Sequence, residues 1–140
     1  MPEIKPVGNI AQTVAASGLR AQQARMRIIA ENIANSDSTS RTPGGDPYRR
    51  QAPVFEPTRV AGGGTGVRMS KVEADKTEFR KEYEPGNPSA DADGYVKLPN
   101  VNGLIEAMDM REAQRAYEAN LNVIETSRAM AQRTLDILKK

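Results

Sequence analysis

The stretch that decides the fold of this chain is 102–138, which reads NGLIEAMDMREAQRAYEANLNVIETSRAMAQRTLDIL. It contains no Pro, and its only Gly stands near its beginning. Residues recur in it with alternating steps of three and four, in two series that lie about 110° apart on one helix. The first series is Met110, Ala113, Tyr117, Asn120, Ile124, Ser127, Ala131, Thr134 and Leu138, and the second is Ala116, Ala119, Val123, Thr126, Met130, Arg133 and Ile137. The stretch therefore predicts a long helix with two packing seams.

These two seams bear on function because a single partner helix covers only one of them. At 1.5 Å per residue the helix would be roughly 55 Å long, which is too long for a compact domain of this size. We therefore expect the helix to meet more than one other chain. A wide core face in an ordinary helical bundle would give the same spacing, and periodicity alone leaves that alternative open.

A second helix is predicted near the N-terminus, over residues 9–35. Asn9 followed by Gln12 resembles a capping pair, and Asn35 can take the left-handed conformation that stops a helix. Ser17-Gly18 is a weak point inside it. Its two seams are Ile10, Val14, Ser17, Ala21, Ala24 and Ile28, and Ala15, Leu19, Gln22, Met26, Ile29 and Ile33. Residues 1–8 contain two Pro and one Gly and are expected to be disordered on their own.

Residues 36–66 lack a helical period, and Pro and Gly interrupt them. Short strands are predicted over 67–74, 77–83 and 95–98. Pro99 ends the last of them, and either Asn100 or Asn102 caps the long helix. The predicted fold class is mainly α with a small β-containing insert. In it the N- and C-terminal helices form a coiled-coil-like pair, and the middle segment is irregular or a β-hairpin.

Composition argues against several function classes. The 140 residues include no Cys and no His, so thiolate metal sites and triads that contain His are excluded, and the commonest zinc ligand is missing. We expect no pocket with paired carboxylates, no metal, no cofactor and no enzyme activity. The net charge of +2 is small and spread along the chain, which argues against nucleic-acid binding. No apolar run reaches the roughly 18 residues of a membrane span, and no cleaved secretory signal is apparent.

Three segments are candidate binding sites. The segment 89–100 faintly resembles a calcium loop, but it lacks the bidentate Glu and the preceding helix, so an Asp-Gly turn is favoured. Gly62–Gly64 is not followed by the residues of a phosphate loop and reads as a flexible connection or a hairpin tip. Tyr48, Arg49 and Arg50 would suit an anion, although a solvated loop or an ion pair between subunits is the preferred interpretation.

Several motifs resemble one known family. Residues 28–35 read IIAENIAN and are followed by SDST, a run that resembles the N-terminal signature of the flagellar rod–hook axial protein family. Further blocks resemble its proximal-rod members: RTPGGDPYRRQ at 41–51, YEPGNP at 83–88, GYV at 94–96, PNVN at 99–102 and RAYEAN at 115–120. The residues that carry the resemblance include Asn32, Asn35, Tyr48, Arg49, Arg50, Pro99, Asn100 and Asn102.

The resemblance implies a structural subunit of the bacterial flagellar basal body, in a rod that crosses the periplasmic space. It implies that 9–35 and 101–140 form a discontinuous helical rod-core domain and that 36–100 form an outer segment. The implied partners are copies of the chain itself, other rod proteins, basal-body ring or adaptor components, and the flagellar type III export apparatus, which needs no cleaved signal peptide. Nucleic acid and membrane insertion are not implied.

The assembly interface predicted from the seams consists of Ile10, Val14, Leu19, Met26, Ile29, Ile33, Tyr117, Val123, Ile124, Met130, Leu135 and Leu138. The runner-up function is a stand-alone helical bundle that acts as an adaptor or an export chaperone. Such a protein would be a stable compact monomer with high helicity. A weak nucleic-acid binder is a third hypothesis.

Overall fold

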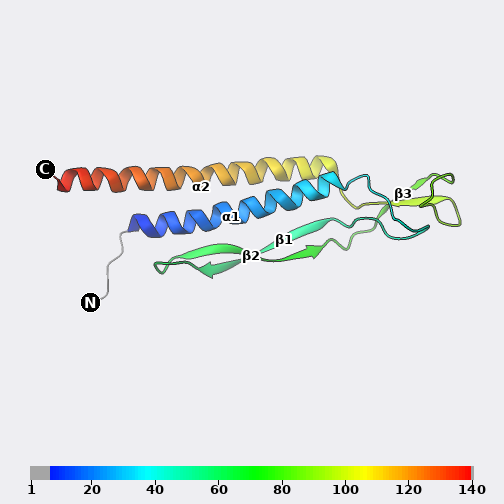
Figure 1. Cartoon of the computed structure of the whole chain (residues 1–140), viewed down its shortest axis with the longest axis horizontal. Helices are drawn as coiled ribbons and strands as arrows, with labels where there is room; N and C mark the ends of the chain where they lie inside the picture. The colour runs from blue at the N-terminus through cyan, green and yellow to red at the C-terminus, as the bar shows by residue number, and fades with distance from the viewer. Residues whose placement is uncertain (1–6, 140) are drawn as a thin grey trace. The chain divides into compact units, whose positions relative to one another are not determined.

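The computed structural model describes residues 7–139. Its elements in chain order are α1 (Val7–Ala34), β1 (Gln51–Arg59), β2 (Thr65–Ala74), β3 (Arg80–Tyr83), β4 (Tyr95–Leu98) and α2 (Gly103–Leu138) (Figure 1). The strands form two two-stranded sheets, β1–β2 and β3–β4. The predicted fold class, two terminal helices with a small β-containing insert, is thereby confirmed. Neither α1 nor α2 is apolar enough over its described length to cross a membrane.

The chain divides into two compact units. The first unit takes residues 7–25, 54–71 and 111–139, and the second takes 26–53 and 72–110. Each unit therefore contains parts of both helices and parts of the strands, and each has its own contacts.

Within the first unit, α1 and α2 run antiparallel and touch along one face of each (Figure 1). Arg25 Nη2 lies 3.4 Å from Glu112 Oε2, and Gly18 lies opposite Asn120. A Cβ added to Gly18 would stand 2.7 Å from Asn120 Nδ2. The glycine expected to weaken α1 instead permits this close approach, and α1 continues through it without a break.

The two seams of α2 have different environments. In the first series Ala113 and Ser127 are buried and Tyr117, Asn120 and Ile124 are half-buried, because α1 covers this side. The second series faces outward: its apolar members beyond Ala119 are Val123, Met130 and Ile137, which are 45%, 63% and 73% exposed. In the antiparallel register of the contacts above, the start of α1 lies opposite residue 130 or 131. Residues 131–139 therefore have no described part of α1 beside them and are exposed in both series.

The other side of α1 is covered by the β1–β2 hairpin of the first unit. Ser17 Oγ donates to the carbonyl of Val14 at 2.6 Å and accepts the amide of Val67 at 3.1 Å. A Cβ on Gly66 would stand 2.3 Å from Ser17 Oγ, so the strand backbone approaches the helix where it has no side chain. Both seams of α1 are thus covered within one chain in this unit.

Strand β1 is absent from the sequence prediction because Pro53 and Pro57 interrupt it. At its two ends the hydrogen bonds to β2 are made by Arg50, whose carbonyl accepts from Asp75, and by Val60, whose amide donates to Gly64. The backbone hydrogen-bonding groups of successive residues point to opposite sides of a strand. Since the even-numbered Arg50 and Val60 face β2, the odd-numbered Pro53 and Pro57 turn their nitrogens away from it. Proline is tolerated at such positions of an edge strand.

Two turns have the conformations that their residue types favour. Gly62 and Gly63 have φ of 97° and 94°, so the glycine run is the tip of the β1–β2 hairpin. Asp91 Oδ1 accepts the amides of Asp93 and Tyr95 at 3.0 and 2.9 Å, which confirms an Asp-Gly turn in place of a calcium loop.

Four predicted boundaries are corrected. Helix α1 begins at Val7, two residues before Asn9, so the expected irregular segment 1–8 loses its last two residues and its first six lie outside the described residues. The left-handed stop at Asn35 is wrong, because no described non-glycine residue has positive φ. The Asn35 side chain instead donates to the carbonyl of Glu31 at 2.8 Å.

The other two corrections concern strands. β2 begins at Thr65 and not at residue 67, because hairpin pairing reaches the glycine tip. β3 spans only Arg80–Tyr83, since the amide of Thr77 turns back to Asp75 Oδ1 at 2.9 Å and leaves the sheet. In the remaining pairing Arg80 lies opposite Leu98 and Tyr83 opposite Tyr95.

Candidate functional site

Five of the motif residues meet in the second unit. Asn32, on α1, is fully buried, and its side chain connects the helix to the start of β1. Its Nδ2 donates to the carbonyl of Gln51 at 2.8 Å, and its Oδ1 accepts from the amide of Gln51 at 2.9 Å and from the hydroxyl of Tyr48 at 2.7 Å. Because a buried amide must find hydrogen-bond partners, the Asn32 side chain holds the segment 48–51 against α1.

Arg50 is the centre of a cluster of carboxylates. Its Nε donates to Glu106 Oε1, and its two terminal nitrogens lie 3.5 Å from Asp75 Oδ2 and 3.6 Å from Asp109 Oδ2. Glu106 is completely buried, and its second oxygen, Oε2, has no hydrogen-bond partner in the described part of the chain. A buried carboxylate of this kind depends on its cation, so Arg50 ties the first turn of α2 to the start of β1.

Arg49 and Asn100 hold the loop after β2. Arg49 Nη1 donates to the carbonyls of Asp75 and Thr77 at 2.8 and 2.9 Å, and its guanidinium carbon lies 4.1 Å from the centre of the Phe79 ring. Asn100 accepts the amide of Arg50 at 2.7 Å and donates to the same two carbonyls at 3.0 and 3.2 Å. Contacts from the side chains of Arg49 and Asn100, in place of β-sheet pairing, therefore hold the segment 75–79.

These contacts resolve two questions that the sequence left open. Asn102 caps α2, since its Oδ1 accepts the amide of Leu104 at 3.0 Å, whereas Asn100 serves the cluster. The solvated loop expected for Tyr48, Arg49 and Arg50 is wrong, whereas an ion pair between subunits stays a prediction. Their side chains are half-buried and bound within their own unit, because the carboxylates of α2 and the carbonyls after β2 converge on them.

The cluster shifts the pKa of the groups in it. Burial alone would lower the pKa of Arg50, but the hydrogen bond and charge of Glu106, with the charges of Asp75 and Asp109, raise it above its ordinary value. Hydrogen bonds from the amide and hydroxyl of Thr77, with the charge of Arg50, lower the pKa of Asp75. Both shifts favour the charged forms of Arg50 and Asp75.

The pKa of Tyr48 is shifted toward the neutral form of its side chain. Burial raises the pKa of its phenol, the negative charges of Glu31 and Glu106 raise it further, and Arg50 partly opposes them. The neutral phenol is the form that donates to Asn32. The network around Tyr48 is therefore a structural one that holds the phenol proton in place.

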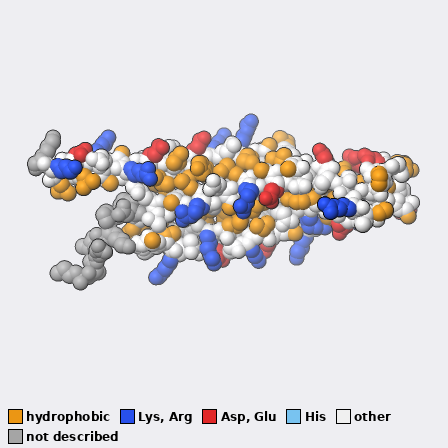
Figure 2. Space-filling view, in the orientation of Figure 1, with side chains coloured by type: hydrophobic (Ala, Val, Ile, Leu, Met, Phe, Trp, Pro, Cys, Tyr) orange, Lys and Arg blue, Asp and Glu red, His pale blue; other side chains and the backbone are white. Residues whose placement is uncertain are grey.

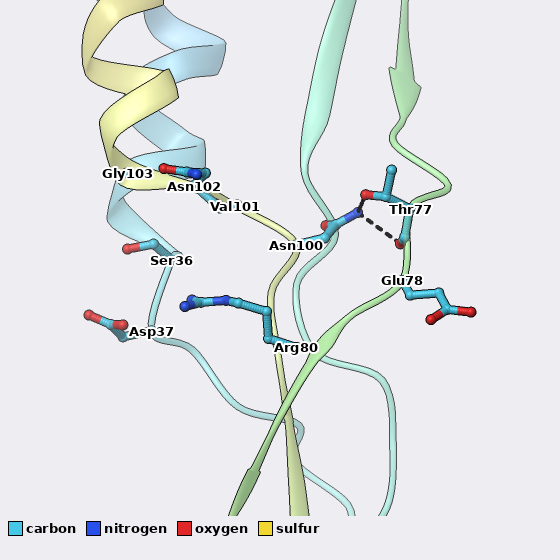
Figure 3. A pocket seen from close by; sticks show the side chains of 9 residues that line it. All are labelled: Ser36, Asp37, Thr77, Glu78, Arg80, Asn100, Val101, Asn102 and Gly103. Carbon is cyan, nitrogen blue, oxygen red and sulfur yellow. Dashed lines mark hydrogen bonds between the residues drawn. The ribbon is translucent and has the colours of Figure 1, made fainter.

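A pocket of about 500 Å³ lies beside this network in the second unit (Figure 3). It is lined by both signs of charge, with Asp37, Glu78 and Arg80 among its residues. The sequence predicted no such pocket. Figure 3 shows Glu78 directed away from Asp37, so the two carboxylates do not converge on one point. The pocket does not supply the facing acid and base that hydrolytic chemistry requires, and no group of three or more acidic residues in 7–139 has metal-site geometry.

The residues predicted for assembly fall into two groups. Ile29 is buried by its own chain, and Ile10, Val14, Leu19, Met26, Tyr117 and Ile124 are half-buried. Ile33, Val123, Met130, Leu135 and Leu138 are exposed by 41%, 45%, 63%, 52% and 75%. Figure 2 shows hydrophobic side chains along α2 on its visible face. Only the second group consists of exposed side chains.

Comparison with known proteins gives these features a family. Residues 13–41 match the family described as "Flagella basal body rod protein", and residues 92–137 match "Flagellar basal body rod FlgEFG protein C-terminal". The flagellar basal-body rod protein FlgC of Agrobacterium fabrum is 51% identical over 92% of this chain and 94% of its own length. The chain belongs to the FlgC family. FlgC of Borreliella burgdorferi is 46% identical over 90% of the chain, and FlgC of Salmonella typhimurium 41% identical over 89%, with 94% and 92% of their lengths covered.

Membership in the FlgC family makes the chain a structural component of the flagellar basal-body rod, as the motifs of the sequence implied. Sequence reasoning found Asn32, Arg50 and Asn100 as motif residues but missed Glu106 and Asp75, their buried or half-buried partners. The only signal for Glu106 was a carboxylate in the first turn of a helix, which is an ordinary position for an acidic residue.

Proposed function

We propose that this FlgC-family chain assembles into the tubular, proximal part of the rod through the outward seam of α2. The observation that carries the proposal is the unequal exposure of the two seams. The inner seam is occupied by α1, whereas Val123, Met130 and Ile137 form an apolar line in solvent. Exposed apolar lines on a helix favour burial against further helices. Copies of the chain and other rod proteins are the partners proposed for this seam.

The proposal is tested by placing a charge on the outward seam. Val123→Asp should abolish assembly and swimming, because an unpaired carboxylate would be buried in the helix interface. Gln23→Asp is the matched control, since Gln23 on α1 is exposed and belongs to neither seam of that helix. Both variants should be made and exported at normal levels. Swimming and complete rods in the Val123→Asp strain would show that the outward seam stays in solvent.

We also propose a periplasmic location and export by the type III apparatus without signal-peptide cleavage, as the family resemblance implies. The N-terminal segment is proposed to serve export, and the outward seam to serve assembly. Deleting residues 2–6, which precede α1, should hold the chain in the cytoplasm. Fractionation of cells whose rod is arrested measures this. If the deleted chain reached the periplasm normally, the export signal would lie elsewhere.

A further inference from the structure

The first unit contains an open groove of about 370 Å³ where the β1–β2 hairpin meets α1. Its apolar part includes Val60, Val67 and Met69, and three arginines, Arg20, Arg59 and Arg68, line it as well. All three arginines are exposed. Arg68 pairs with Glu56, but neither Arg20 nor Arg59 has an ion-pair partner in residues 7–139. In Figure 2, Lys and Arg side chains project along the edge that β1 and β2 form.

The same unit carries a surface of complementary chemistry on α2. Glu118, Leu121 and Glu125 are spaced by three and four residues, so they lie on one face of the helix. All three are exposed, Leu121 by 38%. Neither glutamate has an ion-pair partner in the described part of the chain. These three residues form an acidic stripe in which the apolar Leu121 lies between two carboxylates. The groove has the matching arrangement, with apolar side chains between arginines.

The groove and the acidic stripe of one copy cannot meet. Ser17 contacts the hairpin and Gly18 contacts α2, so α1 separates the two surfaces within the first unit. Because the surfaces are different, their pairing between copies is head-to-tail, and each added copy offers a new free groove and a new free stripe. Interfaces of this kind build rings or open helical assemblies and not closed pairs.

We propose that the arginine-lined groove of one copy receives the acidic stripe of α2 from a second copy. This inference rests on the proposed self-assembly of the rod and adds the surface that determines the contact. The two free arginines would pair with Glu118 and Glu125, and Leu121 would lie against the apolar part of the groove. Charge complementarity of this kind fixes the register of an interface and excludes wrong neighbours.

The first experiment is cross-linking of the full-length chain in motile cells. Because the chain has no cysteine, every disulfide comes from introduced residues. Ala61→Cys lies at the groove and Asn122→Cys beside the acidic stripe, and both positions are exposed. On oxidation, the double variant should give a ladder of dimers, trimers and larger species, whereas each single variant should give dimers at most. Absence of the ladder would overturn the proposal.

The second experiment exchanges the charges in that background. Arg20→Glu with Arg59→Glu should lower the ladder by roughly tenfold or more through like-charge repulsion. Adding Glu118→Arg and Glu125→Arg to the same chain should restore it. An unchanged ladder after the first exchange, or no recovery after the second, would overturn the proposal. Circular dichroism of each variant provides the folding control, since all four side chains are exposed.

The two proposals fail in different ways. If Val123→Asp stops rod assembly while the Arg20→Glu, Arg59→Glu chain swims and keeps its ladder, the rod function stands and this contact is wrong. If Val123→Asp also leaves assembly intact while the charge exchange breaks and restores the ladder, the groove contact stands and the outward seam is wrong.

Discussion

Arg50 neutralises more than one charge in the second unit. A single guanidinium lies near the carboxylates of Glu106, Asp75 and Asp109, and only Glu106 is completely buried. The free-energy cost of losing the arginine differs among these pairs, because water cannot solvate a buried charge that has lost its partner. The exposed pair between Arg68 and Glu56 in the first unit provides a comparison within the same chain.

Arg50→Gln should lower the free energy of unfolding by about 3–5 kcal/mol, because Glu106 would remain buried without a cation. Adding Glu106→Gln should recover a large part of this loss, which a double-mutant cycle with urea unfolding measures. Arg68→Gln is the control and should cost about 0–1 kcal/mol. Equal losses for the two arginine variants would mean that Glu106 is solvated.

The same unit should lose stability at both ends of the pH scale. The lowered pKa of Asp75 means that its contribution is present above its unfolded pKa near 3.8 and is lost as the pH falls through the folded value. The raised pKa of Tyr48 means that its contribution is present below its unfolded pKa near 10.0 and is lost as the pH rises through the folded value.

Unfolding measured against pH should therefore show a flatter acid limb in Asp75→Asn and a flatter alkaline limb in Tyr48→Phe. Tyr83→Phe serves as the control for the alkaline limb, because Tyr83 is 64% exposed. An alkaline limb that flattens as much in Tyr83→Phe as in Tyr48→Phe would contradict the role given to the buried phenol.

At the scale of elements, α2 is one helix with two different sides. Its inner seam is packed against α1 in the first unit, and its outer seam is exposed over the same residues. Adjacent positions on this helix are therefore expected to respond to the same substitution in different ways.

Ile124→Asp should destabilise the isolated chain by on the order of 2–5 kcal/mol, because it removes a packed side chain and brings a charge against α1. Met130→Asp should leave the unfolding of the isolated chain nearly unchanged, since Met130 is 63% exposed, and should act only on assembly. Thermal unfolding followed by circular dichroism separates the two. Equal unfolding temperatures for both variants would show that the helix pair does not form in the free chain.

At the scale of the whole molecule, the free chain leaves much helix surface without packing. Residues 131–139 are exposed throughout, and an isolated helix draws most of its stability from packing. We therefore expect this end of α2 to be frayed in the dilute monomer and to become ordered on assembly. A stand-alone bundle would instead protect the entire helix.

Removing residues 131–140 should change the stability of the monomer little and should abolish rod assembly, because Leu135, Ile137 and Leu138 are lost from exposed positions. In the intact monomer the amides of this segment should exchange with solvent fastest among those of α2. Amide exchange and electron microscopy of basal bodies are the measurements. Strong protection in the monomer would favour the adaptor or chaperone function.

The sequence by itself determined the elements whose cause is local. The spacing of apolar and small residues in 102–138 and 9–35 specifies the two helices with two seams each, because helix periodicity depends only on neighbours along the chain. The Asp91–Gly94 turn and the glycine hairpin tip follow from the conformations that those residue types favour. The motifs at 28–39, 48–50 and 99–102 also sufficed to identify the family.

Only the tertiary structure decided which seam is covered and what the motif residues bind. From the sequence, Gly18 is expected to weaken α1, whereas in the structure it makes room for Asn120 of α2. From the sequence, β1 is expected to be irregular, whereas in the structure its prolines face away from β2. Arg50 and Glu106 are 56 residues apart, so nothing local distinguishes Glu106 from an ordinary first-turn acid. These features depend on contacts between distant segments, and the energy of such contacts is set by burial and geometry that exist only in the folded chain.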